Sequence, residues 1–128
     1  MADVNSDASP DADRHVVYKI LRPSEWAAFR QSTVFKGSPV DLVDGYIHLS
    51  TAAQTPETAA KHFGDEPEVI LLSMEATSFG QALRWEPSRG GALFPHLYAE
   101  LPISAVRRSW RIAKGADGRH AFPLELGA

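Results

Sequence analysis

Apolar side chains gather in short blocks along the chain, and three of these blocks have the pattern of β-strands. Residues 16–21 (Val-Val-Tyr-Lys-Ile-Leu) are aliphatic or aromatic apart from one lysine, which is typical of a strand. Residues 69–74 form the most hydrophobic segment, so we expect a central strand there. Residues 46–50 alternate, with Ile47 and Leu49 on one face and polar side chains on the other. The pattern therefore predicts a β-sheet.

Two further segments have the spacing and the ends of short helices. Trp26 and Phe29 recur at helical spacing after Ser24, a plausible N-cap residue. Residues 55–57 (Thr-Pro-Glu) are a favourable helix start, because threonine caps, proline suits the first turn and glutamate complements the helix dipole. We expect this second helix to end at Gly64.

Most of the remaining chain is predicted to form loops, apart from a late strand at residues 109–112. Gly37 starts a loop that extends to Gly45, and residues 83–101 form a longer one that is interrupted by prolines and glycines. A long loop that carries charged and aromatic residues is often functional. Strands interleaved with a few short helices favour an α+β fold over a doubly wound parallel sheet.

Length and composition indicate a single folded domain. The chain has 128 residues, of which 44% are hydrophobic and 23% are charged, which is ordinary for a globular protein. Residues 1–14 are rich in Asp, Ser, Ala and Pro and contain no apolar stretch. We therefore expect a disordered tail rather than a signal peptide, followed by one domain over residues 15–128.

Charge and cysteine content narrow the functional classes. The net charge of −3 provides no broad basic field for non-specific nucleic-acid binding, although it is compatible with a local phosphate site. The sequence has no cysteine, which excludes disulfides, thiolate zinc sites and a cysteine nucleophile and fits a reducing compartment. No apolar run approaches the length of a membrane-spanning helix. We expect a cytoplasmic protein that does not bind membranes.

The first candidate site lies on the polar face of the strand at residues 46–50. Alternation aims Tyr46, His48 and Ser50 in one direction, and Thr51 follows directly. A histidine beside a hydroxyl on a rigid strand can orient a ligand through paired hydrogen bonds, or transfer a proton near neutral pH. The alternative is a half-buried sheet histidine that donates to a backbone carbonyl.

The second candidate cluster is the charged and glycine-containing segment at residues 84–91. Arg84 and Arg89 can hold a phosphate, because each guanidinium presents a planar fork to anionic oxygens. Glu86 can serve as a base or accept a hydrogen bond from a ribose hydroxyl, and Trp85 and the glycine pair are unusual in a plain surface loop. The alternative is an Arg-Glu ion pair on a solvated loop.

The third cluster follows Pro95 and contains His96 and Tyr98, which share one face of an extended segment. These side chains can complete a pocket opposite His48, or they can simply pack as aromatic residues at the edge of the core. A metal site would have to use histidine and carboxylate ligands, and no two histidines have the spacing of a helical pair. We therefore predict no metal, and we find neither a glycine-rich phosphate loop nor a nucleophile elbow.

Taken in order, these motifs resemble a widespread bacterial family of small domains of unknown function. The resemblance covers most of the chain from residue 16 to about residue 106. It rests on residues 17–20, Trp26, residues 44–51 with Gln54 and Thr58, residues 83–86, 88–91 and 94–98. This family resemblance implies no activity.

A shorter stretch is similar to NAD-dependent RNA 2′-phosphotransferases, which have the ADP-ribosyltransferase fold. There too a His-Leu-Ser strand, here residues 48–50, precedes a helix and an apolar strand, here residues 69–72. The resemblance implies a small mixed, split β-sheet around a nicotinamide cleft lined by His48 and Ser50, with NAD as the cofactor. The first strand departs from that superfamily, because Lys19 and its neighbours stand where a His-Gly-Thr motif or an arginine holds the nicotinamide ribose.

Three functions remain open. The first is an enzyme, NAD-dependent and transferase-like, that binds a nucleotide-like ligand and uses His48, Glu86 and His96 as catalytic residues. In this hypothesis the ligand is bound by Ser50, Thr51, Arg84, Trp85, Arg89 and Tyr98. The second is a binding module that keeps the cleft without chemistry, which Lys19 on the first strand favours. The third is an interaction domain in which the same side chains only pack.

Overall fold

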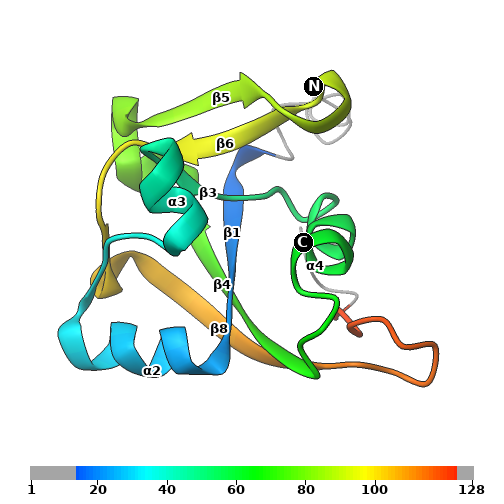
Figure 1. The fold of residues 1–128 in the computed structure, drawn as a ribbon. Helices are drawn as coiled ribbons and strands as arrows, with labels where there is room; N and C mark the ends of the chain where they lie inside the picture. Colours follow the sequence, from blue (N-terminus) through cyan, green and yellow to red (C-terminus); the bar gives the residue numbers. More distant parts are fainter. Residues whose placement is uncertain (1–13, 124–128) are drawn as a thin grey trace, which may run out of the picture.

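Strand β4 (Glu68–Glu75) lies at the centre of the fold, as its hydrophobic pattern predicts. In the computed structural model, which describes residues 14–123, this strand pairs antiparallel with β1 (Val16–Leu21) on one side and with β8 (Val106–Ala113) on the other (Figure 1). The predicted strands at residues 16–21, 69–74 and 109–112 are thereby confirmed, and together they form one sheet.

The other described strands build two smaller sheets. Strands β3 (Ile47–His48), β6 (Leu93–Leu97) and β5 (Leu83–Pro87) form a three-stranded sheet in that order, and β2 (Val34–Phe35) pairs with β7 (Leu101–Pro102). The helices of the described chain are α2 (Pro23–Ser32), α3 (Pro39–Asp44) and α4 (Thr55–His62), with short 3₁₀ segments η2 (Ala76–Ala82), η3 (Arg89–Gly91) and η4 (Ile103–Ala105).

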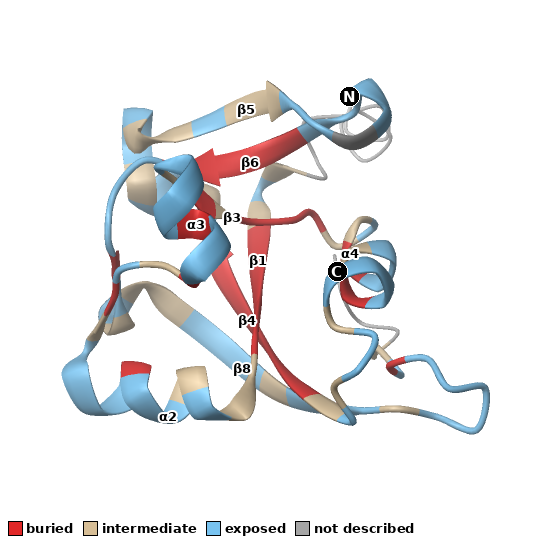
Figure 2. Cartoon of the chain, in the orientation of Figure 1, coloured by how far each residue is buried: buried red, intermediate tan, exposed pale blue. Residues whose placement is uncertain are grey.

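The hydrophobic core lies on both faces of β4, because successive side chains of a strand point to opposite sides. Ile70 and Leu72 join a larger cluster that includes Phe29 of α2 and the sheet of β3, β6 and β5. Leu71 faces the other way, into a cluster with Ala59 of α4. Figure 2 shows β4 and most of β1 as buried, with the helices exposed along their outer faces. The small sheet of β3, β6 and β5 therefore packs against the buried core around β4.

The predicted α+β class is confirmed, since short helices accompany separate β-sheets. The expected mixture of parallel and antiparallel strands is wrong for residues 14–123, where every strand pairing is antiparallel. Parallel neighbours need long crossover connections. Here β5 and β6 are joined by a short hairpin connection instead.

Two segments that we predicted as loops are regular structure. The segment from Gly37 to Gly45 contains α3, and residues 83–101 contain the hairpin of β5 and β6. The spacing of hydrophobic residues does not reveal helix α3, because Leu42 and Val43 point to solvent rather than to the core. The hairpin contains prolines in both strands, and proline usually argues against a strand.

The helix boundaries differ slightly from those expected. Helix α2 begins at Pro23 after Arg22, so Ser24 lies inside it, and α4 ends at His62 rather than at Gly64. Residues 1–13 and 124–128 lie outside the described residues, so the N-terminal tail and the limits of the domain stay predictions. No helix within residues 14–123 is long and apolar enough to span a membrane.

The core position of β4 generates a stability prediction. Replacing fully buried Leu71 with alanine should destabilise the protein by about 2–5 kcal/mol, because the change removes apolar contacts and leaves a cavity. The same replacement at Leu42, which is exposed on α3, should change the free energy of unfolding by less than about 0.5 kcal/mol. Urea unfolding of both variants measures the difference, and equal losses would contradict the assigned burial.

Candidate functional site

Helix α3 is defined by its capping residues. Ser38 precedes the helix as N-cap, Pro39 occupies the first position, and the Asp41 side chain accepts a hydrogen bond from the Ser38 backbone N–H at 2.8 Å. The helix ends at Asp44 and is capped by Gly45, whose φ of 89° is left-handed. Gly37 is also required, because its φ is 134° and a Cβ there would lie 2.9 Å from the Cβ of Asp41.

Asp41 is the anchor of the site. Its carboxylate is buried at 2% exposure and accepts hydrogen bonds from three parts of the chain. The Lys19 ammonium of β1 donates to Oδ2 at 3.0 Å, while Nδ1 of His48 donates to Oδ1 at 2.6 Å. The backbone N–H of His48 donates to the same Oδ1 at 3.1 Å. One carboxylate therefore joins β1, α3 and β3.

The electrostatics of this anchor favour an ionised carboxylate. Burial alone would raise the pKa of Asp41, but the His48 hydrogen bond, the Lys19 charge and the backbone N–H groups of Ser38 and His48 together lower it to about 2. Burial lowers the pKa of the Lys19 ammonium, and the adjacent Asp41 carboxylate opposes that shift. We take the pair as ionised at neutral pH, because Asp41 satisfies the ammonium directly and the His48 carbonyl accepts a second bond at 3.0 Å.

His48 is held between two carboxylates. Its Nδ1 bonds Asp41, and its Nε2 lies 2.9 Å from Oδ2 of Asp44, at the end of α3. Both contacts are hydrogen bonds only when both ring nitrogens carry a proton, because a carboxylate accepts and does not donate. Asp44 is partly exposed, so this second contact can be exchanged for a ligand more readily than the first.

The second histidine is the cross-strand neighbour of the first. His96 of β6 pairs with His48 of β3, and their ring centroids are 5.6 Å apart. Tyr46 stacks on the His96 ring at 4.1 Å and lies 4.6 Å from the His48 ring. The two histidines therefore lie side by side on one sheet face, and not on opposite walls of a pocket as we expected from the sequence.

Glu86 connects His96 to Tyr98. Its Oε1 accepts from Nδ1 of His96 at 2.8 Å and from the Tyr98 hydroxyl at 2.7 Å. The Tyr98 bond, followed by the His96 bond, lowers the pKa of Glu86, and the same Tyr98 bond raises the pKa of the tyrosine. Glu86 is thus an ionised acceptor that fixes the His96 ring.

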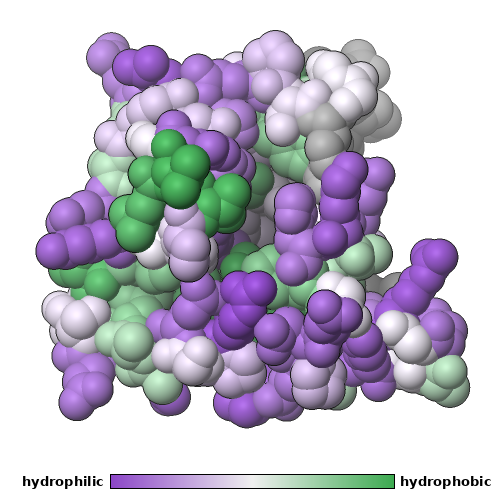
Figure 3. Space-filling model, viewed as in Figure 1, coloured by the Kyte–Doolittle hydropathy of each residue, from purple (hydrophilic) through white to green (hydrophobic). Residues whose placement is uncertain are grey.

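A pocket of about 490 Å³ opens beside His48 and His96, within the range of roughly 300–1,000 Å³ typical of ligand sites. One wall is formed by α3 with Asp41 and Asp44, and the base includes Ser50. We call this cavity the α3–α4 pocket, because helix α4 provides the facing wall. Figure 3 shows the hollow between the hydrophobic side chains of α3 and the hydrophilic side chains around it.

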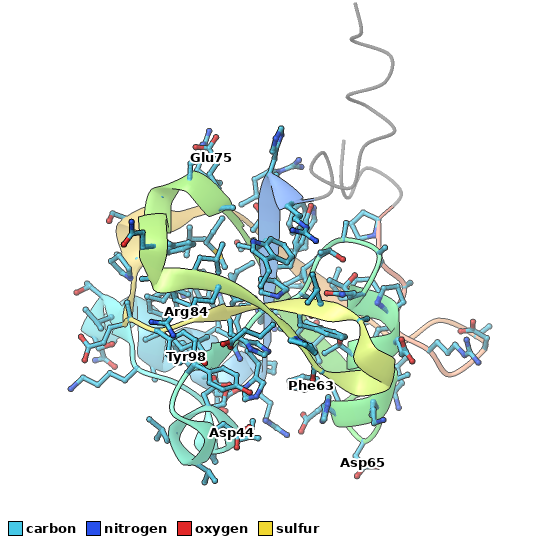
Figure 4. The ribbon with its side chains drawn as sticks, turned by 90° about the horizontal axis from the view of Figure 1, so that it is seen from above. Asp44, Phe63, Asp65, Glu75, Arg84 and Tyr98 are labelled. Carbon is cyan, nitrogen blue, oxygen red and sulfur yellow. The ribbon has the colours of Figure 1, made fainter. Side chains whose placement is uncertain are left out.

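The α4 wall carries positive and hydroxyl groups. Thr58, Lys61 and His62 line it, followed by Phe63 directly after the helix. In Figure 4, viewed from above, Asp44 of α3 and Phe63 lie at separate sides of this region. The pocket therefore has the partly exposed Asp44 carboxylate on its α3 wall and the Lys61 ammonium on its α4 wall.

Of the residues singled out from the sequence, His48, Ser50 and His96 line the pocket. Glu86 and Tyr98 do not line the pocket: Glu86 binds His96, and Tyr98 binds Glu86. The Ser50 hydroxyl lies 3.3 Å from that of Thr58, so strand and helix are bridged at the pocket base.

The other predicted residues lie elsewhere. The Arg84 guanidinium covers the Tyr98 ring at 4.5 Å, and Figure 4 shows the two side chains close together. Trp85 packs against the core, because alternation along β5 turns it away from the face of Glu86. Thr51 exchanges hydrogen bonds with Gln54 before α4. Arg89 belongs to η3, and its side chain lies outside what the structure describes.

Sequence reasoning missed Lys19 as a partner of His48, it missed Asp41 and Lys61 altogether, and it gave Asp44 no role within the motif of residues 44–51. A signal for Asp41 was present, because a serine, a proline and an acidic residue at the third helical position are a capping pattern. A lone lysine in an apolar strand was a second signal, since lysine is rarely buried without a partner. Among residues 14–123, no group of three His, Asp or Glu side chains is arranged to hold a metal ion.

Comparison with known proteins identifies the family. The family model described as "Protein of unknown function (DUF952)" matches residues 20–109, which is more than half of the chain. The chain belongs to this family, and the predicted membership in a family of unknown function is confirmed. No curated protein matches the chain significantly.

Two solved structures of one bacterial relative support the fold. The crystal structure of protein CC0527 from Caulobacter crescentus is 48% identical, covers 83% of this chain and 93% of its own, and has a TM-score of 0.79. The solution NMR structure of the same protein is 49% identical, covers 81% and 90% of the two chains, and has a TM-score of 0.74. This chain is therefore similar to that protein over nearly all of the relative's length.

The depressed pKa of Asp41 predicts acid sensitivity. A carboxyl group whose pKa falls from 3.8 to about 2 on folding stabilises the protein above pH 4, and this contribution is lost as the pH falls toward 2. The difference corresponds to about 2 kcal/mol. The decline in unfolding free energy over this interval should therefore be smaller by about that amount in Asp41→Asn than in wild type.

Denaturant unfolding at several pH values between 2 and 5 measures this effect. Asp65→Asn is the matched control, because Asp65 is exposed (Figure 4) and should leave the wild-type profile unchanged. Profiles of equal steepness in wild type and Asp41→Asn would contradict the role of Asp41 as the ionised anchor.

Proposed function

We propose that the α3–α4 pocket binds a nucleotide, with NAD or ADP-ribose as the expected ligand, and that His96 performs acid–base chemistry on it. The pocket has the size of a small-molecule site and combines apolar surface with a few convergent polar groups. The polar groups come from β1, α3, β3, β6 and α4, so a single ligand can contact several elements at once.

The observation that carries the proposal is how the two ring nitrogens of His96 are hydrogen-bonded. His96 is only 3% exposed and lines the pocket, and its Nδ1 is bound to Glu86. Its Nε2 has no hydrogen-bond partner among the described residues. Buried polar atoms normally have a partner, so an unpartnered nitrogen beside a pocket is suited to a bound ligand.

The chemistry of this nitrogen follows from its tautomer. Because the Glu86 carboxylate accepts from Nδ1, the proton of the neutral ring lies on Nδ1 and Nε2 carries a lone pair. Nε2 can then accept a proton from a ribose hydroxyl or from a group that attacks the ligand. Glu86 stabilises the protonated ring that results, as the carboxylate does in other carboxylate–histidine pairs.

The resemblance of residues 48–50 and 69–72 to the NAD-dependent RNA 2′-phosphotransferases supports the choice of ligand. Strand β3 with His48, and Ser50 two residues beyond it, precede α4 and the central β4, in the order seen in the NAD-dependent phosphotransferases. In that fold the corresponding strand lines the nicotinamide cleft, and both residues line the pocket here. The lack of cysteine agrees with a cytoplasmic, reducing location for such a protein.

The second candidate function is a binding module without chemistry, and Lys19 favours it. In the superfamily, the first strand offers a side chain to the nicotinamide ribose, whereas the ammonium of Lys19 is committed to Asp41 and to the His48 carbonyl. Conversion of NAD to nicotinamide and an ADP-ribosyl product by the purified protein would exclude the module. Binding without turnover would exclude the enzyme.

The proposed function predicts saturable binding of NAD or ADP-ribose, measured by titration calorimetry and by a rise in melting temperature. His96→Phe keeps the ring that stacks on Tyr46 but removes both nitrogens, so affinity should fall by about 10-fold, the value of one hydrogen bond. His48→Ala should weaken binding by a similar factor, about 10-fold, because the ligand loses an orienting group.

The matched control is His15→Phe, since His15 is exposed and does not line the pocket. Its affinity should equal that of wild type. Absence of binding at millimolar NAD and ADP-ribose would overturn the proposal, and so would wild-type affinity in His96→Phe.

A further inference from the structure

The positive charges around the α3–α4 pocket differ in whether a carboxylate neutralises them. Lys19 is paired with Asp41 at 3.0 Å, and Arg22 is paired with Glu66 at 2.9 Å. Lys61 also lines the pocket, yet it is exposed and has no ion-pair partner among residues 14–123. Its charge is therefore the one at the pocket that remains available to an anion from outside the described chain.

The position of Lys61 on α4 gives it suitable neighbours. Thr58, Lys61 and His62 are spaced three and four residues apart, so they share one helix face, and all of them line the pocket. A hydroxyl, an ammonium and an imidazole are the side chains that proteins use to bind phosphate oxygens. The face of α4 thus presents a donor set directed toward the pocket.

The opposite wall is unsuited to an anion. The partly exposed Asp44 carboxylate lies there and repels a phosphate unless a cation intervenes, whereas the charge of Asp41 is already paired with Lys19. An asymmetric charge distribution of this kind orients a ligand, because each end of the ligand prefers one wall.

We infer that the phosphate of the ligand binds at the α4 wall through Lys61, with Thr58 and His62 beside it, and that the ribose and base extend toward His48 and His96. This inference rests on the proposed function and assigns the ligand class as a nucleoside phosphate. Arg84, which the sequence suggested for phosphate, lies over the Tyr98 ring outside the pocket lining.

The helix itself does not supply the attraction. Lys61 and His62 belong to the last turn of α4, where the helix dipole is negative and disfavours an anion. The side chains must therefore supply the attraction, which makes phosphate recognition sensitive to the Lys61 charge and to salt.

The experiment compares nucleotides with their nucleosides by titration calorimetry: nicotinamide mononucleotide with nicotinamide riboside, and AMP with adenosine. Wild type should bind the phosphorylated member about 10-fold more tightly, the value of a charge-assisted hydrogen bond. Lys61→Ala should abolish this preference without weakening nucleoside binding, and Lys61→Arg should retain it. Added salt should reduce the preference in wild type.

Lys36→Ala is the matched control, because it removes the same charge from an exposed position that does not line the pocket. It should keep the preference for the phosphorylated ligand. If wild type prefers the nucleotides and Lys61→Ala retains that preference in full, the inference about α4 is overturned while the proposed function stands. If wild type binds none of these ligands, nor NAD or ADP-ribose, the proposed function itself fails.

Discussion

The buried Asp41 carboxylate is the interaction on which the rest of the site depends. It joins Lys19 of β1 to the ring and the backbone of His48 on β3, and it closes the first turn of α3 through Ser38. Burying such an ion pair costs desolvation free energy, which hydrogen bonds must offset. Four donors bind the two carboxylate oxygens of Asp41, so its hydrogen bonds offset this cost and hold β1, α3 and β3 in fixed positions.

Helix α3 illustrates why this anchor is needed. The helix has six residues, too few to be stable alone in water. Its apolar side chains do not hold it in place, because Val40, Leu42 and Val43 are 55%, 64% and 84% exposed. Figure 3 shows these residues as a hydrophobic patch on the surface. The contacts of Asp41 are therefore the principal buried attachment of the helix that forms one wall of the pocket.

The sequence predicts the parts of this fold that follow from local pattern. The runs at β1 and β4, the start of α4 at Thr55, and the shared face of His48 and Ser50 are all readable from propensity and alternation. The family was likewise recognisable from its motifs. These features depend on neighbours within a few residues of each other in the chain.

The rest depends on contacts between distant segments. The pairing of β3 with β6, which sets His48 beside His96, joins residues nearly 50 positions apart, and no local pattern specifies it. The ion pair of Lys19 and Asp41 also joins two separate segments, and no local pattern specifies that these two residues meet. Arg84 looked like a phosphate ligand because its stacking on Tyr98 is invisible in the sequence. Nothing in the local sequence distinguishes Lys61, which lines the pocket only because the fold places α4 there.

The two histidines of the site are not equivalent, although the sequence suggested similar roles for them. His48 has both ring nitrogens beside carboxylates, and its backbone N–H and carbonyl are bound as well, so its position is over-determined. His96 is fixed on one side only, by Glu86, and keeps Nε2 without a partner among the described residues. A group that transfers a proton needs a free nitrogen directed at the ligand, whereas a group that orients a ligand needs a rigid position. Within the proposed function, this geometry favours His96 for proton transfer and His48 for orientation of the ligand, because Glu86 fixes the His96 ring through Nδ1 alone.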